Sequence, residues 1–130
     1  MAEALYNQLA RQQGLDTFAT SAGLMAYEGM PASMGAQMAM EKRGADLSLH
    51  TAKTVDAQKL ADADLVLCMQ ENHRAALVAR YPQYAGKIHT LLGYALGKEA
   101  SVPDPFGGDE AVYDYCAGQI LEAVRKILEK

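Results

Sequence analysis

Leu65-Val66-Leu67-Cys68-Met69 is the stretch that decides the fold, because it is a continuous apolar run of strand length. A strand that is apolar at every position suits a parallel sheet with helices on both faces. Around this run the sequence predicts helices over 56–61 and 71–81, the second ending before Pro82. Another strand is predicted over 87–92. Strands that alternate with helices in this way predict an α/β protein with right-handed crossovers.

The outer parts of the chain continue this alternation. A helix over 1–13 stops at Gly14, and a short strand over 17–21 follows it. Ser33 is a good N-cap for a helix over 33–40. The final helix, over 109–129, has the clearest amphipathic pattern. The side chains expected on its buried face are Val112, Cys116, Ile120, Val124 and Ile127.

Composition narrows the class of protein. A chain of 130 residues fits a single domain over 1–130. A net charge of −4 argues against a nucleic-acid partner, since such proteins carry a basic stripe. No apolar run approaches the roughly 20 residues of a membrane span, and no leader peptide is visible. The two cysteines lie far apart in sequence, which favours free thiols in a cytoplasmic protein, and no metal or cofactor motif is present.

Three short motifs carry a family resemblance. They are Met1-Ala2-Glu3-Ala4-Leu5, Ser21-Ala22-Gly23 with Tyr27, Gly29 and Pro31 downstream, and Asp104-Pro105-Phe106-Gly107-Gly108. Each is weak alone, but together, in this order and at these spacings, the chain resembles the low-molecular-weight protein-tyrosine phosphatases. The resemblance implies a three-layer α/β/α, Rossmann-like fold with a short parallel sheet.

The resemblance also implies that a part of this fold lies outside the 130 residues. In the family, a helix like the one at Met1 directly follows a central strand and a phosphate-binding loop. That loop holds the nucleophilic cysteine and an arginine, and neither has a counterpart here. We therefore expect an N-terminally truncated domain that lacks its first, central strand and is inactive as a 130-residue chain.

Several residues match functional positions of the family. The implied reaction hydrolyses phosphotyrosine in proteins through a phosphocysteine intermediate. Asp104 matches the general acid, and its neighbours Pro103 and Pro105 restrict its backbone. Tyr27 and Phe106 match aromatic residues that bind the substrate, and Ser21 and His50 match residues that support the phosphate loop. We expect no metal and no cofactor.

Four alternatives accompany this interpretation. Cys68 and Arg74 have the spacing of a phosphatase loop, but no glycine lies between them and Glu71 would repel phosphate. Phosphoarginine is a possible substrate in place of phosphotyrosine, because the residues that separate the two lie partly outside this chain. The chain could instead be a catalytically dead binding or oligomerising module, including a strand-exchanged homodimer at open strand edges. A thiol redox enzyme is disfavoured, because Cys68 and Cys116 are not placed as a pair.

Overall fold

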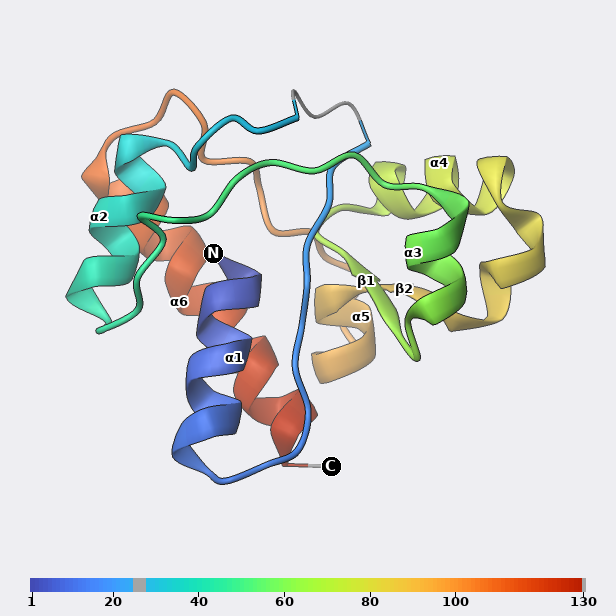
Figure 1. The fold of residues 1–130 in the computed structure, drawn as a ribbon, viewed down its shortest axis with the longest axis horizontal. Helices are drawn as coiled ribbons and strands as arrows, with labels where there is room; N and C mark the ends of the chain where they lie inside the picture. The colour runs from blue at the N-terminus through green and yellow to red at the C-terminus, as the bar shows by residue number, and fades with distance from the viewer. Residues whose placement is uncertain (25–27, 130) are drawn as a thin grey trace. The chain divides into compact units, whose positions relative to one another are not determined.

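A computed structural model describes residues 1–24 and 28–129 of the chain. Its elements, labelled in Figure 1 where there is room, are α1 (Ala2–Gln12), α2 (Met34–Lys42), α3 (Ala57–Asp62), β1 (Val66–Cys68), α4 (Glu71–Arg80), a 3₁₀ helix (Pro82–Lys87), β2 (Ile88–Thr90), α5 (Leu91–Leu96) and α6 (Glu110–Leu128). The chain divides into two compact units. We call Met1–Thr54 with Asp104–Lys130 the terminal unit, and Val55–Pro103 the central unit.

The core of the terminal unit forms where α1 and α2 pack on α6. Leu5 of α1 and Met40 of α2 are both completely buried there, against the buried face of α6. Burying a side chain of this size contributes roughly 1.5–3 kcal/mol. The predicted helices over 1–13, 33–40 and 109–129 are therefore confirmed, with ends that differ by a few residues.

One prediction for α6 is wrong by a single position. Val112 was expected on the buried face, yet it is 40% exposed and Tyr113 is buried in its place. The Tyr113 ring packs over Gly35 of α2, so closely that a β-carbon there would come within 2.4 Å of the ring. Its hydroxyl reaches Ser33, the N-cap of α2, at 3.0 Å. Tyr113 is the buried residue because its ring packs in the core while its hydroxyl still forms a hydrogen bond.

The predicted strand over 17–21 is also wrong, because no strand pairs with it in the described part of the chain. The segment instead runs along α1, as Figure 1 shows. The Asn7 side chain of α1 takes the place of a neighbouring strand at one residue: its amide donates to the Ala19 carbonyl at 2.9 Å and its carbonyl accepts the Ala19 N–H at 2.7 Å. A strand needs a ladder of such pairs, and a single side chain supplies only one.

The central unit contains the sheet. β1 and β2 pair in parallel, with Val66 opposite Ile88 and Cys68 opposite Thr90. The strand predicted over 65–69 is therefore confirmed over its three central residues, Val66–Cys68. The strand predicted over 87–92 is confirmed only as far as Thr90, whose hydroxyl caps α5 by accepting the Gly93 N–H at 3.1 Å. The N-terminal cap of α5 therefore decides where β2 ends, although the apolar residues continue beyond Thr90.

Among the described residues, none of the helices has both the length and the apolar content needed to cross a lipid bilayer.

Candidate active site

Asp104 lies in a tight turn just before α6. Its carboxylate accepts the backbone N–H of Phe106 at 3.0 Å, so the side chain is held by its own turn. The carbonyl of Pro105 then accepts the N–H of Gly108 at 2.8 Å, which closes a second turn. Both Asp104 and Phe106 face solvent, and Phe106 is 80% exposed. The structure therefore places the predicted acid and one predicted substrate-binding aromatic in one exposed, ordered turn, which we call the acid turn (104–108).

Two glycines allow this turn. Gly107 has a φ of +82°, in the left-handed region that side chains disfavour. A β-carbon at Gly108 would lie 2.9 Å from the Pro105 carbonyl and 3.0 Å from Val112. Asp109 follows and caps α6, because its carboxylate accepts the Val112 N–H at 3.0 Å. Each residue of the sequence Gly-Gly-Asp after Phe106 therefore has a role in the local structure: Gly107 and Gly108 permit the turn, and Asp109 caps α6.

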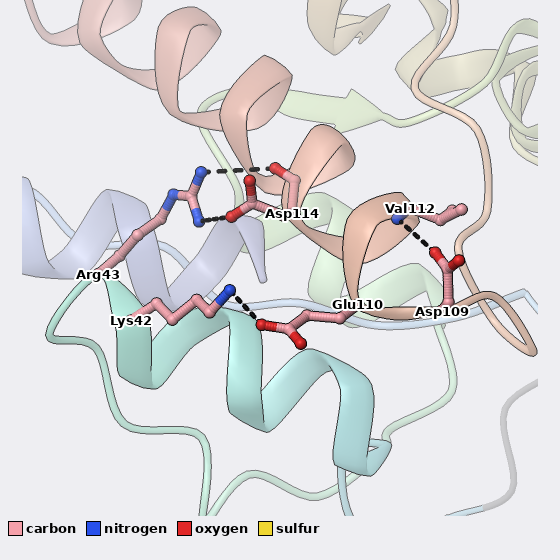
Figure 2. A network of polar contacts seen from close by, with 6 residues as sticks. All are labelled: Lys42, Arg43, Asp109, Glu110, Val112 and Asp114. Carbon is pink, nitrogen blue, oxygen red and sulfur yellow. Dashed lines mark hydrogen bonds and ion pairs between the residues drawn. The ribbon is translucent and has the colours of Figure 1, made fainter.

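A polar network joins the start of α6 to the end of α2 (Figure 2). Arg43 donates to the Asp114 carboxylate at 2.7 Å and to the Asp114 backbone carbonyl at 3.4 Å. Lys42 forms an ion pair with Glu110 in the first turn of α6. The acid turn therefore leads into a helix whose first two turns form ion pairs with residues at the end of α2.

The ion pair with Arg43 should be visible in the pKa of the Asp114 carboxyl. The hydrogen bond from Arg43 and the charge of Arg43 lower the pKa of Asp114, with a smaller contribution from Lys42. A lowered pKa means that the ion pair stabilises the fold at neutral pH, and that this is lost as pH falls through the lowered value. Arg43→Gln should therefore raise the pKa of Asp114 in an NMR titration. Lys59→Gln, which removes the partner of Asp56 in the central unit, should leave Asp114 unchanged.

Ser21 and His50 meet at Glu3. The Ser21 hydroxyl donates to one Glu3 carboxylate oxygen at 3.1 Å, and His50 Nδ1 lies 3.3 Å from the other. The two predicted supporting residues are thus brought together by a third residue that the sequence did not single out. Glu3 belongs to the helix motif Met1–Leu5, but its partners lie 18 and 47 positions away, so no local pattern pointed to it. We call Glu3, Ser21 and His50 the carboxylate cluster.

A cavity of about 160 Å³ adjoins the carboxylate cluster and is lined in addition by Leu49, Thr51 and Lys53. Backbone hydrogen bonds join the chain segments on either side of the lining residues. The Gly23 N–H donates to the Lys53 carbonyl at 2.8 Å, and the Ala52 N–H donates to the Met30 carbonyl at 2.7 Å. Tyr27, the other predicted substrate-binding aromatic, lies outside the described residues. No hydrogen bond or ion pair within the described residues connects the acid turn to the carboxylate cluster.

Cys68 and Arg74 do not form a phosphate site. Cys68 is only 7% exposed, and burial raises the pKa of its thiol to about 11. It is therefore protonated at neutral pH, while a nucleophilic cysteine must be a thiolate. Arg74 donates from Nε and Nη2 to the two carboxylate oxygens of Glu71, at 2.8 and 2.5 Å. The spacing that suggests a phosphatase loop is thus a buried strand residue followed by an ion pair within α4.

Cys116 is equally unsuited to attack a substrate. It is completely buried in α6, and burial raises the pKa of its thiol, with a further contribution from the negative charge of Asp104. Both cysteines are free thiols. Among residues 1–24 and 28–129, no three His, Cys, Asp or Glu side chains are grouped so that they could hold a metal ion.

Comparison with known proteins gives consistent matches over the whole chain. The protein-arginine-phosphatase of Bacillus subtilis is 30% identical over 130 residues, which span all of this chain and 86% of the relative. The crystal structure of a low molecular weight protein tyrosine phosphatase from T. tengcongensis is 40% identical, with a TM-score of 0.95, covering 98% of this chain and 87% of that one. A cysteine-to-serine variant of the YwlE arginine phosphatase, with a phosphorylated active-site serine, matches at 30% identity and a TM-score of 0.95, covering 98% of this chain and 84% of that chain.

The family model described as low molecular weight phosphotyrosine protein phosphatase matches residues 1–130. Relatives of this chain carry the names protein-arginine-phosphatase, in Bacillus subtilis, and low molecular weight phosphotyrosine protein phosphatase, in Homo sapiens. The α/β architecture with a small parallel sheet agrees with the solved relatives. This chain therefore belongs to the low molecular weight phosphotyrosine protein phosphatase family.

Proposed function

We propose that this chain supplies the general acid and the substrate wall of a protein phosphatase that hydrolyses phosphotyrosine. The observation that carries the proposal is the acid turn, in which Asp104 is exposed, ordered by its own N–H bond and followed at once by an exposed aromatic ring. General acid catalysis depends first on such positioning. Both units are taken as parts of one phosphatase domain, because the family model spans residues 1–130.

In the proposed reaction a cysteine thiolate attacks phosphorus, forming an S–P bond while the P–O bond to the phenol breaks. Asp104 gives its proton to the departing oxygen, so that a neutral phenol leaves. A water molecule then attacks the phosphocysteine, its proton passes to Asp104, and phosphate and thiolate are released. The Phe106 ring packs against the aryl group of the substrate. Tyr27 is assigned the same role from the family resemblance.

The thiolate is not supplied by residues 1–130 in this proposal. Both cysteines are buried with raised pKa values, and Arg74 already has a carboxylate partner. We therefore propose that the 130-residue chain is inactive alone. Ser21 and His50 are assigned the support of the phosphate loop, with Glu3 as the residue that holds both. The lack of a disulfide between the two cysteines supports a cytoplasmic location.

The first test is an assay of residues 1–130 with a phosphotyrosine peptide and a phosphoarginine peptide at neutral pH. We expect no turnover above that of the Cys68→Ser and Cys116→Ser variants. Activity that disappears in either variant would show that a buried thiol is the nucleophile after all.

The second test joins a family strand and phosphate loop to the amino terminus of residues 1–130. The joined chain should hydrolyse the phosphotyrosine peptide. A kcat/KM at least about tenfold higher for the phosphoarginine peptide would replace the proposed substrate by phosphoarginine, which relatives named arginine phosphatases make a specific alternative. A joined chain that folds but hydrolyses neither peptide would exclude the proposed function.

A further inference from the structure

We infer that Tyr113 is a positioning residue for the proposed general acid, Asp104, and acts on it through the first turn of α6. This role rests on the function proposed above, in which Asp104 protonates the departing phenol. It adds a reason why the acid keeps its place although its turn faces solvent. Tyr113 is only 5% exposed and belongs to the core of the terminal unit, whereas Asp104 and Phe106 are exposed.

The Tyr113 side chain joins α6 to the start of α2. Its ring lies so close to Gly35 that a β-carbon there would be 2.4, 2.6 and 2.7 Å from three ring carbons. Its hydroxyl shares a hydrogen bond of 3.0 Å with Ser33, and the Ser33 hydroxyl also accepts the Ala36 N–H at 3.2 Å as the cap of α2. Close packing on one helix and a bond to its cap together leave the ring little freedom to shift.

The first turn of α6 carries this restraint back to its cap residue. The Tyr113 N–H donates to the Asp109 carbonyl at 3.2 Å. The Val112 N–H donates to the Asp109 carboxylate at 3.0 Å, as Figure 2 shows. Asp109 is therefore bonded through its backbone and through its side chain to the turn that Tyr113 holds.

The acid turn lies directly against this first helical turn. A β-carbon at Gly108 would be 3.0 Å from two side-chain atoms of Val112, so the backbone of the acid turn touches α6. Within the acid turn, the Gly108 N–H donates to the Pro105 carbonyl at 2.8 Å, and the Phe106 N–H donates to the Asp104 carboxylate at 3.0 Å. A shift of the first turn of α6 would therefore be passed on to the carboxylate.

The ion pairs of Figure 2 join the same part of α6 to the other end of α2. Their side chains are partly or largely exposed, and exposed ion pairs hold their geometry weakly. The Tyr113 ring is buried and in contact with backbone, so it is the firmer of the two connections. This difference is the reason for assigning the positioning role to Tyr113.

Tyr113→Phe is the first test, because it keeps the ring and removes only the hydroxyl that reaches Ser33. In residues 1–130, the amides of Phe106 and Gly108 should exchange with solvent about threefold faster or more, since the bonds inside the acid turn would open more often. Tyr115→Phe is the matched control. It removes the same atom from a ring that is 62% exposed on the same helix, and it should leave both exchange rates unchanged.

The second test measures kcat/KM in the joined chain. Tyr113→Phe should lower this value for the phosphotyrosine peptide by about three- to tenfold, because a small misplacement of a catalytic group is costly. Gly35→Ala should lower it by about tenfold or more, because the added β-carbon displaces the ring while alanine favours the helix itself. Tyr115→Phe should match the unsubstituted joined chain. An aryl phosphate with a low-pKa leaving group departs without protonation, so its kcat/KM should fall less than about twofold in every variant.

A role that is only structural predicts a different pattern. Equal losses with the peptide and with the low-pKa aryl phosphate would overturn the inference. So would a full further loss when Tyr113→Phe is added to Asp104→Asn, because a residue that acts through the acid has nothing left to position. Unchanged exchange and unchanged kcat/KM in Tyr113→Phe would overturn it as well, while the loss in Asp104→Asn would still support the proposed function. If Asp104→Asn kept its full kcat/KM, the proposed function would fail, and this role with it.

Discussion

Asp104→Asn is expected to lower kcat for a phosphotyrosine peptide by about 10²–10⁴-fold, in the joined chain that carries a family strand and phosphate loop. The asparagine keeps the shape and can still accept the Phe106 N–H, so the acid turn should persist. It has no acidic proton to give to the departing phenolate. The loss should become much smaller for an aryl phosphate with a low-pKa leaving group, which departs without protonation.

The matched control for this measurement is Asp109→Asn, the same change five residues further along. Asparagine caps helices about as well as aspartate, so α6 should begin at the same residue. We expect kcat within about twofold of the unsubstituted joined chain. Equal losses in both variants would show that the acid turn depends on negative charge in general, and would remove the specific role of Asp104.

Leu5→Ala should strongly destabilise the terminal unit, at a cost of about 2–5 kcal/mol. Leu5 is 0% exposed and lies in α1 where it packs on α6, so its removal leaves a cavity between two long helices. The free energy of opening is best measured by hydrogen exchange of the α6 amides, because the chain contains two compact units and the probe must lie in the affected one.

Tyr6→Phe is the control for Leu5→Ala. It changes the neighbouring residue and removes only the exposed hydrogen bond to Thr17, so we expect a change within about 0.5 kcal/mol. If Leu5→Ala were as mild as Tyr6→Phe, α1 would not be an integral part of the terminal core.

Much of the local structure could be predicted because its causes are local in sequence. The side chains of Ser33 and Asp56 cap α2 and α3, because each accepts a hydrogen bond from the backbone N–H three residues ahead. Such a cap residue indicates the start of a helix from the sequence itself. The apolar run around Leu67 likewise contains the reason for β1 in itself. Asp104 and Phe106 share a turn because both belong to one short motif.

The errors and omissions involve partners that are distant in sequence. Whether residues 17–21 become a strand depends on what lies beside them, and the neighbour is Asn7 rather than another strand. Glu3 looks like an ordinary acidic residue in a first helical turn until Ser21 and His50 converge on it. Tyr113 is buried in place of Val112 because Gly35, which lies in another helix, leaves room for its ring.

The two contacts between α1 and the segment beside it have a geometric consequence. Glu3 and Asn7 are one helical turn apart, about 6 Å along the axis, and bind Ser21 and Ala19, which are about 6.6 Å apart in extended chain. Helix and segment run in opposite directions, and the spacing of Glu3 and Asn7 nearly equals that of Ser21 and Ala19, so both contacts form at once. Inserting one residue between Ala19 and Ser21 would break this match and turn Ser21 away from Glu3. The length of this stretch is therefore constrained even though most of its side chains face solvent.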